Sequence, residues 1–196
     1  MVAVEELAGR TAFAKRLVRA RTRRQRGATL IEIATVLAIV ALVIAGVLAI
    51  YTNAETSRKT SEALGQVANI QQAVRSLYGG QATFTGLNAS ALISSNHVPQ
   101  KMVAGTMLRH AFNGPITIAP ANPGGVTDGG FQVSFGQVPR EACIKFLTSD
   151  LGRAVFSVGT GTAVKSLDGS NPPPFNPTEA TTACSANLNT VTWVFI

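Results

Sequence analysis

The stretch RGATLIEIATVLAIVALVIAGVLAIYTNA, residues 26–54, decides how this chain is organised, because residues 33–54 form a mostly apolar run of 22 residues without a formal charge. About 20 apolar residues suffice for a helix to cross the hydrocarbon of a bilayer. A cleaved secretory signal has an apolar core of only about 7 to 15 residues. The run therefore favours a membrane-spanning helix over a secretory signal.

A single carboxylate, Glu32, lies at the start of the apolar run. An ionisable group inside a membrane-length segment costs about 2.5 to 3.5 kcal/mol on insertion scales, so a partner or a function usually accounts for it. A cut between Gly27 and Ala28 would create an ammonium group four residues before Glu32. The new ammonium group of one subunit could then pair with the Glu32 carboxylate of another. The alternative is an interfacial acid near the end of an ordinary anchor.

The positive charge of the chain is concentrated before the apolar run. The 196 residues carry a net charge of +7, and residues 1–27, with eight basic and two acidic side chains, hold +6 of it. Basic residues next to a membrane helix stay on the cytoplasmic side. We therefore expect a cytoplasmic leader, a membrane helix and an exported domain that is nearly neutral. The leader has one aromatic residue, Phe13, and is not expected to bind nucleic acid directly.

Both cysteines of the chain, Cys143 and Cys184, lie in the part expected to be exported. An oxidising compartment favours a disulfide between them. Closing a loop of about 42 residues would stabilise the domain by roughly 4 kcal/mol in the chain-entropy model. Two buried free thiols are the alternative.

The helix is expected to continue beyond the apolar run, because residues 55–78 contain no proline and are followed by Gly79 and Gly80. Apolar side chains recur there at the three-and-four spacing of an amphipathic helix: Leu64, Val67, Ile70 or Gln71, Val74 and Leu77. A single helix over residues 28–78 would extend about 76 Å. Its first half requires apolar surroundings, and its second half requires a domain against its apolar stripe.

From residue 81 onward, short apolar runs are interrupted by Gly, Pro, Asn and Ser. Strands are expected at residues 115–119, 131–135, 154–158 and 191–196, short helices at 89–93 and 141–149, and exposed loops at 119–130 and 168–177. The predicted fold class is α+β, in which the long N-terminal helix packs on a C-terminal antiparallel sheet domain.

Signals for catalysis, metals and cofactors are weak. Residues 159–166 partly match a phosphate-binding loop, but Val164 stands where a glycine should precede the lysine. His97 and His110 have no cysteine or acidic neighbours at ligand spacing, so we expect two polar loop or surface histidines. We predict that the chain is not an enzyme and uses no cofactor.

The residues before and inside the apolar run resemble a known processing site. This segment resembles the processing site of type IV prepilins, because it consists of a basic leader, Gly27, Ala28 and then Thr-Leu-Ile-Glu ahead of an apolar helix. The long leader, and Ala28 instead of the phenylalanine usual in the type IVa group, point to type IVb. Further segments are similar to the major pilins of the type IVB and conjugative thin-pilus sort: residues 72–78, 86–87, 98–99 and 141–143.

The resemblance implies that a prepilin peptidase cuts after Gly27 and methylates the amine of Ala28. Glu32 occupies the position of the assembly glutamate, and Cys143 and Cys184 delimit the variable C-terminal region. The chain divides into a leader (1–27), a transmembrane and assembly half-helix (28–54), an amphipathic half-helix (55–80) and a globular pilin domain (81–196).

The expected function is that of a structural subunit, a major pilin, which polymerises with itself by helix packing and serves adhesion or conjugative DNA transfer. The implied partners are the peptidase, the assembly platform with its ATPase, and an outer-membrane secretin. The precursor would lie in the bacterial inner membrane with its C-terminal domain periplasmic, and the assembled pilus would be extracellular. Two alternatives remain: a minor pilin or secretion-system pseudopilin, and a monomeric membrane-anchored binding domain.

Overall fold

The computed structural model describes residues 29–161 and 163–196. The chain divides into two compact units, Met1–Leu48 and Ala49–Ile196, and helix α2 (Leu30–Leu77) contributes residues to both. This 48-residue helix confirms the long helix expected from the sequence. The expected first residue of the helix, Ala28, lies outside the described part.

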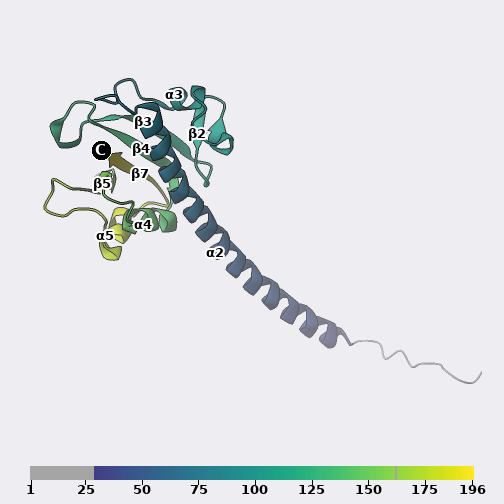
Figure 1. Ribbon diagram of the computed structural model, residues 1–196. Coiled ribbons are helices and arrows are strands. Elements are labelled where there is room, and N and C mark those ends of the chain that lie inside the picture. The colour runs from purple at the N-terminus through teal and green to yellow at the C-terminus, as the bar shows by residue number, and fades with distance from the viewer. Residues whose placement is uncertain (1–28, 162) are drawn as a thin grey trace, which may run out of the picture. The chain divides into compact units, whose positions relative to one another are not determined.

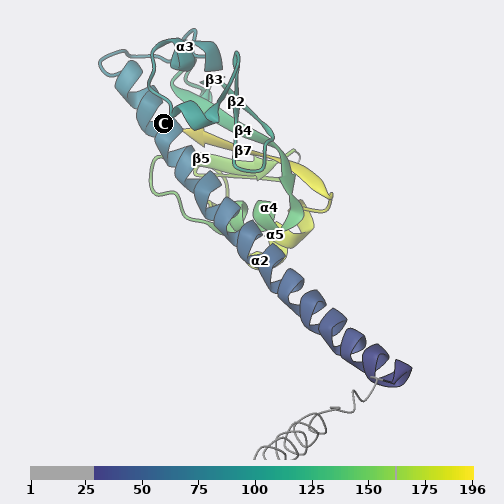
Figure 2. The same cartoon turned by 90° about the vertical axis from the view of Figure 1, so that its right-hand side faces the viewer.

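The second half of α2 packs against the sheet of the second unit (Figures 1 and 2). Its buried positions recur at spacings of three and four: Thr60, Ala63, Gln66, Val67, Ile70, Ala73 and Val74. Val67, Ile70 and Val74 are on the predicted stripe, whereas Leu64 and Leu77 are only half-buried. The stripe is therefore smaller and more polar than expected, with Gln66 accepting a hydrogen bond from the backbone N–H of Ala111 at 3.0 Å.

Seven antiparallel strands form a single sheet in the order β1-β2-β3-β4-β7-β5-β6 (Figure 1). The strands are β1 (Val103–Ala104), β2 (Met107–Arg109), β3 (Pro115–Ala121), β4 (Gly130–Pro139), β5 (Val155–Thr160), β6 (Ala163–Ser166) and β7 (Leu188–Phe195). The four strands predicted from the sequence correspond to β3, β4, β5 and β7. Strands β1, β2 and β6 were not predicted.

The two faces of the sheet differ because side chains alternate along each strand. Phe131, Val133 and Phe135 of β4 are buried, as are Trp193 and Phe195 of β7. On the opposite face, Ser134 and Thr192 pair across the same two strands, with their hydroxyl oxygens 2.8 Å apart. One face thus packs against the core and the other is polar, as is common for antiparallel sheets.

Short helices complete the second unit: α3 (Ala89–Ser94), α4 (Arg140–Thr148), α5 (Pro177–Ala183), and the 3-10 turns η1 (Gln100–Met102) and η2 (Pro123–Gly125). Helices α3 and α4 confirm the two predicted short helices. Helix α5 was not predicted. It begins at a capping box, in which the Asn176 side chain accepts from the Glu179 N–H at 2.9 Å and the Glu179 side chain accepts from the Asn176 N–H at 3.1 Å.

Three expectations about exposed segments require correction. Residues 119–121 extend β3 and residues 123–125 form η2, so the expected 119–130 loop is shorter. Phe175, in the expected 168–177 loop, is buried. His97 is exposed as expected, whereas His110 follows β2 in the sequence but is only 3% exposed. Its ring stacks on Phe135, with 4.9 Å between the ring centroids.

Candidate functional site

Glu32 lies in the first turn of α2. The backbone N–H of Glu32 donates to the carbonyl oxygen of Thr29 at 2.9 Å and is 3.4 Å from the Thr29 hydroxyl. A carboxylate in the first turn interacts favourably with the positive end of the helix dipole. Glu32 therefore lies at the helix end that suits an acidic side chain.

The apolar part of α2 exposes its large side chains on every side of the helix. Exposed fractions include 89% for Leu30, 72% for Ile31, 73% for Ile50 and 66% for Tyr51. The most apolar window of 18 residues has a mean hydropathy of 3.0, and none of it is buried in the folded chain. A helix that is apolar all round belongs in a membrane or in a protein core. This part of α2 is long and apolar enough to cross a membrane.

Of the residues predicted to act in processing and assembly, the structure places Glu32 alone. Gly27 and Ala28 lie outside the described residues. Between residues 29 and 54, Glu32 is the one residue with a formal charge. The described part of the candidate assembly site is therefore an exposed apolar helix with a carboxylate in its first turn.

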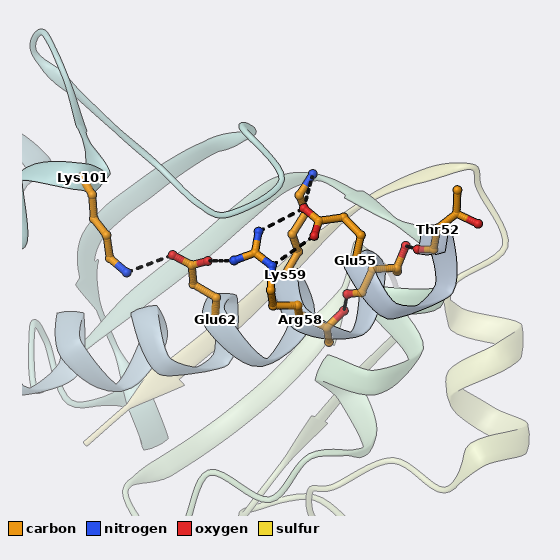
Figure 3. Close-up of polar contacts among 8 residues, drawn as sticks. Thr52, Glu55, Arg58, Lys59, Glu62 and Lys101 are labelled. Atoms are coloured by element: carbon orange, nitrogen blue, oxygen red, sulfur yellow. Dashed lines mark hydrogen bonds and ion pairs between the residues drawn. The ribbon is translucent and has the colours of Figure 1, made fainter. Parts of the chain in front are cut away.

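Directly after the apolar run, a cluster of charged side chains connects α2 to the rest of the second unit (Figure 3). Glu55 accepts from Arg58 at 3.0 Å and lies 3.5 Å from the Lys59 ammonium, and Arg58 lies 3.6 Å from the Glu62 carboxylate. Lys101, in η1, donates to Glu62 at 2.9 Å. This last contact joins residues 39 positions apart in the sequence.

The cluster keeps its carboxylates ionised. The hydrogen bond from Arg58 lowers the pKa of Glu55, and the hydrogen bond from Lys101 lowers the pKa of Glu62. The same pairing with Glu55 raises the pKa of Arg58. Paired, ionised side chains therefore begin directly after the apolar run, which ends at residue 54.

Sequence reasoning missed this cluster although part of its signal is visible. Opposite charges in this part of the helix are spaced three or four residues apart, which places them side by side on its surface. The residues are Glu55, Arg58, Lys59 and Glu62. Lys101 carries no such signal, because only the folded chain brings η1 against α2.

The disulfide predicted between Cys143 and Cys184 is confirmed. Cys143 is in α4, Cys184 follows α5, and both are fully buried. The bond encloses β5, β6 and α5, so it fixes the edge of the sheet that lies beyond β7.

Metal binding finds no support in residues 29–161 and 163–196, which contain no group of three or more His, Cys, Asp or Glu side chains placed to hold an ion.

Comparisons with known proteins agree with this architecture. A family model described as "PilS N terminal" matches residues 55–196, and one described as "Prokaryotic N-terminal methylation motif" matches residues 22–48. The major structural subunit of bundle-forming pilus from Escherichia coli O127:H6 (strain E2348/69 / EPEC) is 31% identical over 137 residues, 69% of this chain and 70% of that protein. The protein of the same name from Escherichia coli O111:H- matches equally well.

Two solved structures share the fold. The type IVb pilin from Salmonella typhi has a TM-score of 0.52 and 15% identity, covering 67% of this chain and 95% of that one. TcpA, a type IV pilin from Vibrio cholerae El Tor biotype, has a TM-score of 0.52 and 13% identity, covering 70% and 98%. The long helix on an antiparallel sheet is therefore a pilin fold, and the chain belongs to the PilS family of type IVb pilins.

Proposed function

We propose that this pilin is the major subunit of its pilus and that it polymerises through the apolar half of α2. The observation that carries the proposal is the exposure of that half-helix on all sides, with Glu32 its one formal charge between residues 29 and 54. Such a surface requires apolar surroundings, which a bilayer supplies before assembly and a bundle of equivalent helices supplies afterwards. The bundle-forming pilus relatives are named major subunits, which favours that role over a minor pilin.

Before assembly, the precursor would lie in the inner membrane with its basic leader, residues 1–27, in the cytoplasm and its globular domain in the periplasm. A prepilin peptidase would cut between Gly27 and Ala28 and methylate the new amine. The match to the methylation motif covers residues 22–48 and supports this site. An assembly platform with its ATPase, and a secretin, would be the further partners.

In this proposal the mature chain has three parts. Residues 28–54 are the assembly half of the helix and residues 55–80 are its amphipathic half. Residues 81–196 are the globular domain. The charged cluster around Glu55 and Arg58 supports the first boundary, because it begins where the apolar run ends.

Glu32 would pair with the amine of Ala28 on an adjacent subunit. In a bundle of apolar helices, an unpaired carboxylate costs several kcal/mol. The sequence has no Lys or Arg between residues 28 and 57, so a neighbouring copy of the same helix offers its terminal ammonium as the nearest cation. Pairing would also set the axial stagger between neighbouring subunits, because it fixes one helix start against the first turn of the next.

The substitution Glu32→Gln tests assembly. It removes the charge with little change in shape, so the variant should fold, insert and be processed while filament yield in sheared fractions falls at least tenfold. The matched control is Glu141→Gln, which neutralises an exposed carboxylate in α4 and should leave the yield unchanged. Wild-type filament yield from Glu32→Gln, beside equal amounts of processed pilin, would contradict the pairing.

Processing is tested separately by intact mass. The mature protein should lack residues 1–27, with or without one added methyl group, and Gly27→Leu should accumulate as full-length precursor in the inner membrane. A cut at another position, or a mature protein that begins at Met1, would overturn the proposed site even if filaments form. The pilin should also dominate sheared filaments, whereas a minor pilin would be scarce there.

A further inference from the structure

The turn between β2 and β3, residues 110–114, closes over a buried imidazole ring. His110 is only 3% exposed. Its ring stacks on Phe135, with 4.9 Å between the ring centroids. Gly114 lies so close to the ring that even a Cβ atom there would overlap it. The ring therefore fills the space that the turn and β4 leave for it.

The two ring nitrogens of His110 have different and defined roles. The backbone N–H of Phe112 donates to Nδ1 at 3.2 Å, so Nδ1 is an acceptor and carries no proton. Nε2 lies 2.7 Å from the carbonyl oxygen of Gly136, which can only accept, so Nε2 carries the proton and donates. The geometry thus specifies a neutral ring with its proton on Nε2.

A second proton on this ring would have no acceptor. Protonation of Nδ1 would direct an N–H at the N–H of Phe112, which breaks that hydrogen bond and leaves buried donors unpaired. A half-turn of the ring in place does not help, because it replaces each nitrogen with a carbon. Burial also lowers the pKa of His110. An imidazolium must therefore leave the space between Phe135 and Gly114.

The described elements around His110 offer no free carboxylate to stabilise a positive ring. Strands β3 and β4 contain no ionisable side chain. On β2, Arg109 is itself a cation and donates to the carbonyl oxygen of Asn113 at 2.6 Å. On α2, Gln66 is uncharged, and Glu62, one helical turn earlier, belongs to the charged cluster and is already paired. The surroundings thus favour the neutral ring.

The ring cannot leave without moving the turn. The N–H of His110 donates to the carbonyl oxygen of Gly114 at 3.1 Å, and the N–H of Asn113 donates to that of His110 at 2.7 Å. The N–H of Ala111 donates to the Gln66 side chain at 3.0 Å and so joins the turn to α2. Strand β2 is three residues long and pairs with β3 at two positions, so this edge should open more readily than the central strands.

We propose that His110 is an acid-sensitive latch, which holds turn 110–114 against β4 and α2 while its ring is neutral and releases the turn when the ring is protonated. The central strands β4, β7 and β5 pair with one another without the turn, so they stay folded. Release exposes the half-buried Phe112 and frees Gln66 on α2. The latch contains no residue of the apolar half of α2 and is independent of the proposed pairing of Glu32.

The size of the effect follows from proton linkage. In the open turn, the ring regains its ordinary pKa of 6.5, whereas the closed turn requires the neutral ring. The ratio of open to closed turns is therefore constant above about pH 6.5 and rises as the pH falls below that value. At pH 5 the ratio can increase by at most about 30-fold, because the pH is then 1.5 units below the pKa of the open form.

Amide hydrogen exchange of the full chain in lipid nanodiscs tests the latch. Exchange rates are measured by mass spectrometry at pH 7.5 and 5, and each is divided by the rate of the unfolded chain at the same pH. In wild type, the protection of the peptide that carries Ala111 and Phe112 should fall by about 10- to 30-fold at pH 5. The protection of β4 and β7 should change by less than about twofold.

Three variants separate the latch from a merely structural contact. His110→Gln removes the titrating ring, so the protection of the turn should be the same at both pH values, whatever its level. His97→Gln, at an exposed histidine, should behave like wild type. Gln66→Leu removes the acceptor of the Ala111 N–H and should lower protection at both pH values without changing the pH dependence.

The latch is overturned if the turn of the wild type keeps its protection at pH 5, or if His110→Gln loses protection as strongly as wild type does. An equal loss in β4 and β7 would show global unfolding and would overturn local release. If His110→Gln does not fold, an NMR titration of the wild-type ring decides. Protonation of Nδ1 should then coincide with the loss of protection in the turn, and protonation while the turn stays protected would overturn the proposal.

Discussion

Removal of the disulfide should destabilise the second unit by an amount that the loop length sets. Cys143 and Cys184 are 41 residues apart, and both are fully buried. In the chain-entropy model, a closed loop of about 42 residues restricts the unfolded chain by about 13 cal/mol/K, or about 4 kcal/mol at 25 °C. The double substitution Cys143→Ala/Cys184→Ala removes the bond without burying a hydroxyl or leaving a free thiol.

The assay is urea unfolding of the full chain in nanodiscs, followed by the fluorescence of Trp193 in the core. The free energy of unfolding should fall by about 3 to 5 kcal/mol, and the melting temperature by on the order of 10 °C for a unit of this size. The wild type under reducing conditions should match the double variant, which separates the cross-link from the lost sulfur atoms. A loss below about 1 kcal/mol with an unchanged urea slope would refute the cross-link reasoning.

Two further predictions concern the turn around His110. Burial lowers the pKa of His110 below its ordinary 6.5. The free energy of unfolding should therefore be unaffected by this ring above about pH 6.5 and should fall as the pH drops below that value, because the unfolded chain binds the proton more readily. Urea midpoints at pH 7.5 and 5 should show this loss in wild type and in His97→Gln, but much less in His110→Gln. A Cβ at Gly114 would overlap the His110 ring and a backbone carbonyl, so Gly114→Ala should lower the free energy of unfolding by about 2 kcal/mol or more. The control is Gly65→Ala on α2, where a Cβ meets open space. This substitution should raise the free energy of unfolding by about 0.5 to 1 kcal/mol. The same urea assay measures both, and equal effects of the two alanines would contradict the packing argument.

The long helix and the central strands could be predicted because their signals are local. Composition and the three-and-four spacing identify α2, and short apolar runs identify β3, β4, β5 and β7. Helix α5 was missed because the proline-rich segment before it indicates a loop, although Asn176 and Glu179 at capping-box spacing with Pro177 between them are a helix-start signal. Strand β6 is only four residues long and carries Lys165, so its apolar pattern is weak.

The candidate site could be predicted only where the residue types and their spacing in the sequence are enough to indicate it. Glu32 stands out because one carboxylate interrupts a long uncharged run, and two cysteines in one domain allow a single intramolecular pairing. The ion pair of Lys101 with Glu62 and the burial of His110 depend on contacts between residues distant in sequence. Such contacts arise from the sheet order, in which β7 lies between β4 and β5, and no local pattern specifies that order.

The position of β7 has a consequence for the timing of export. The strand follows every other strand in the sequence, yet it joins β1–β4 on one side to β5 and β6 on the other. A chain that crosses the membrane from its N-terminal end therefore presents two incomplete half-sheets, with the edges of β4 and β5 unpaired, until its final strand emerges. Open edges invite pairing with other chains, and distant strand pairs close slowly. On the proposed export route, the sheet therefore stays open to pairing with other chains until the C-terminal strand β7 has crossed the membrane.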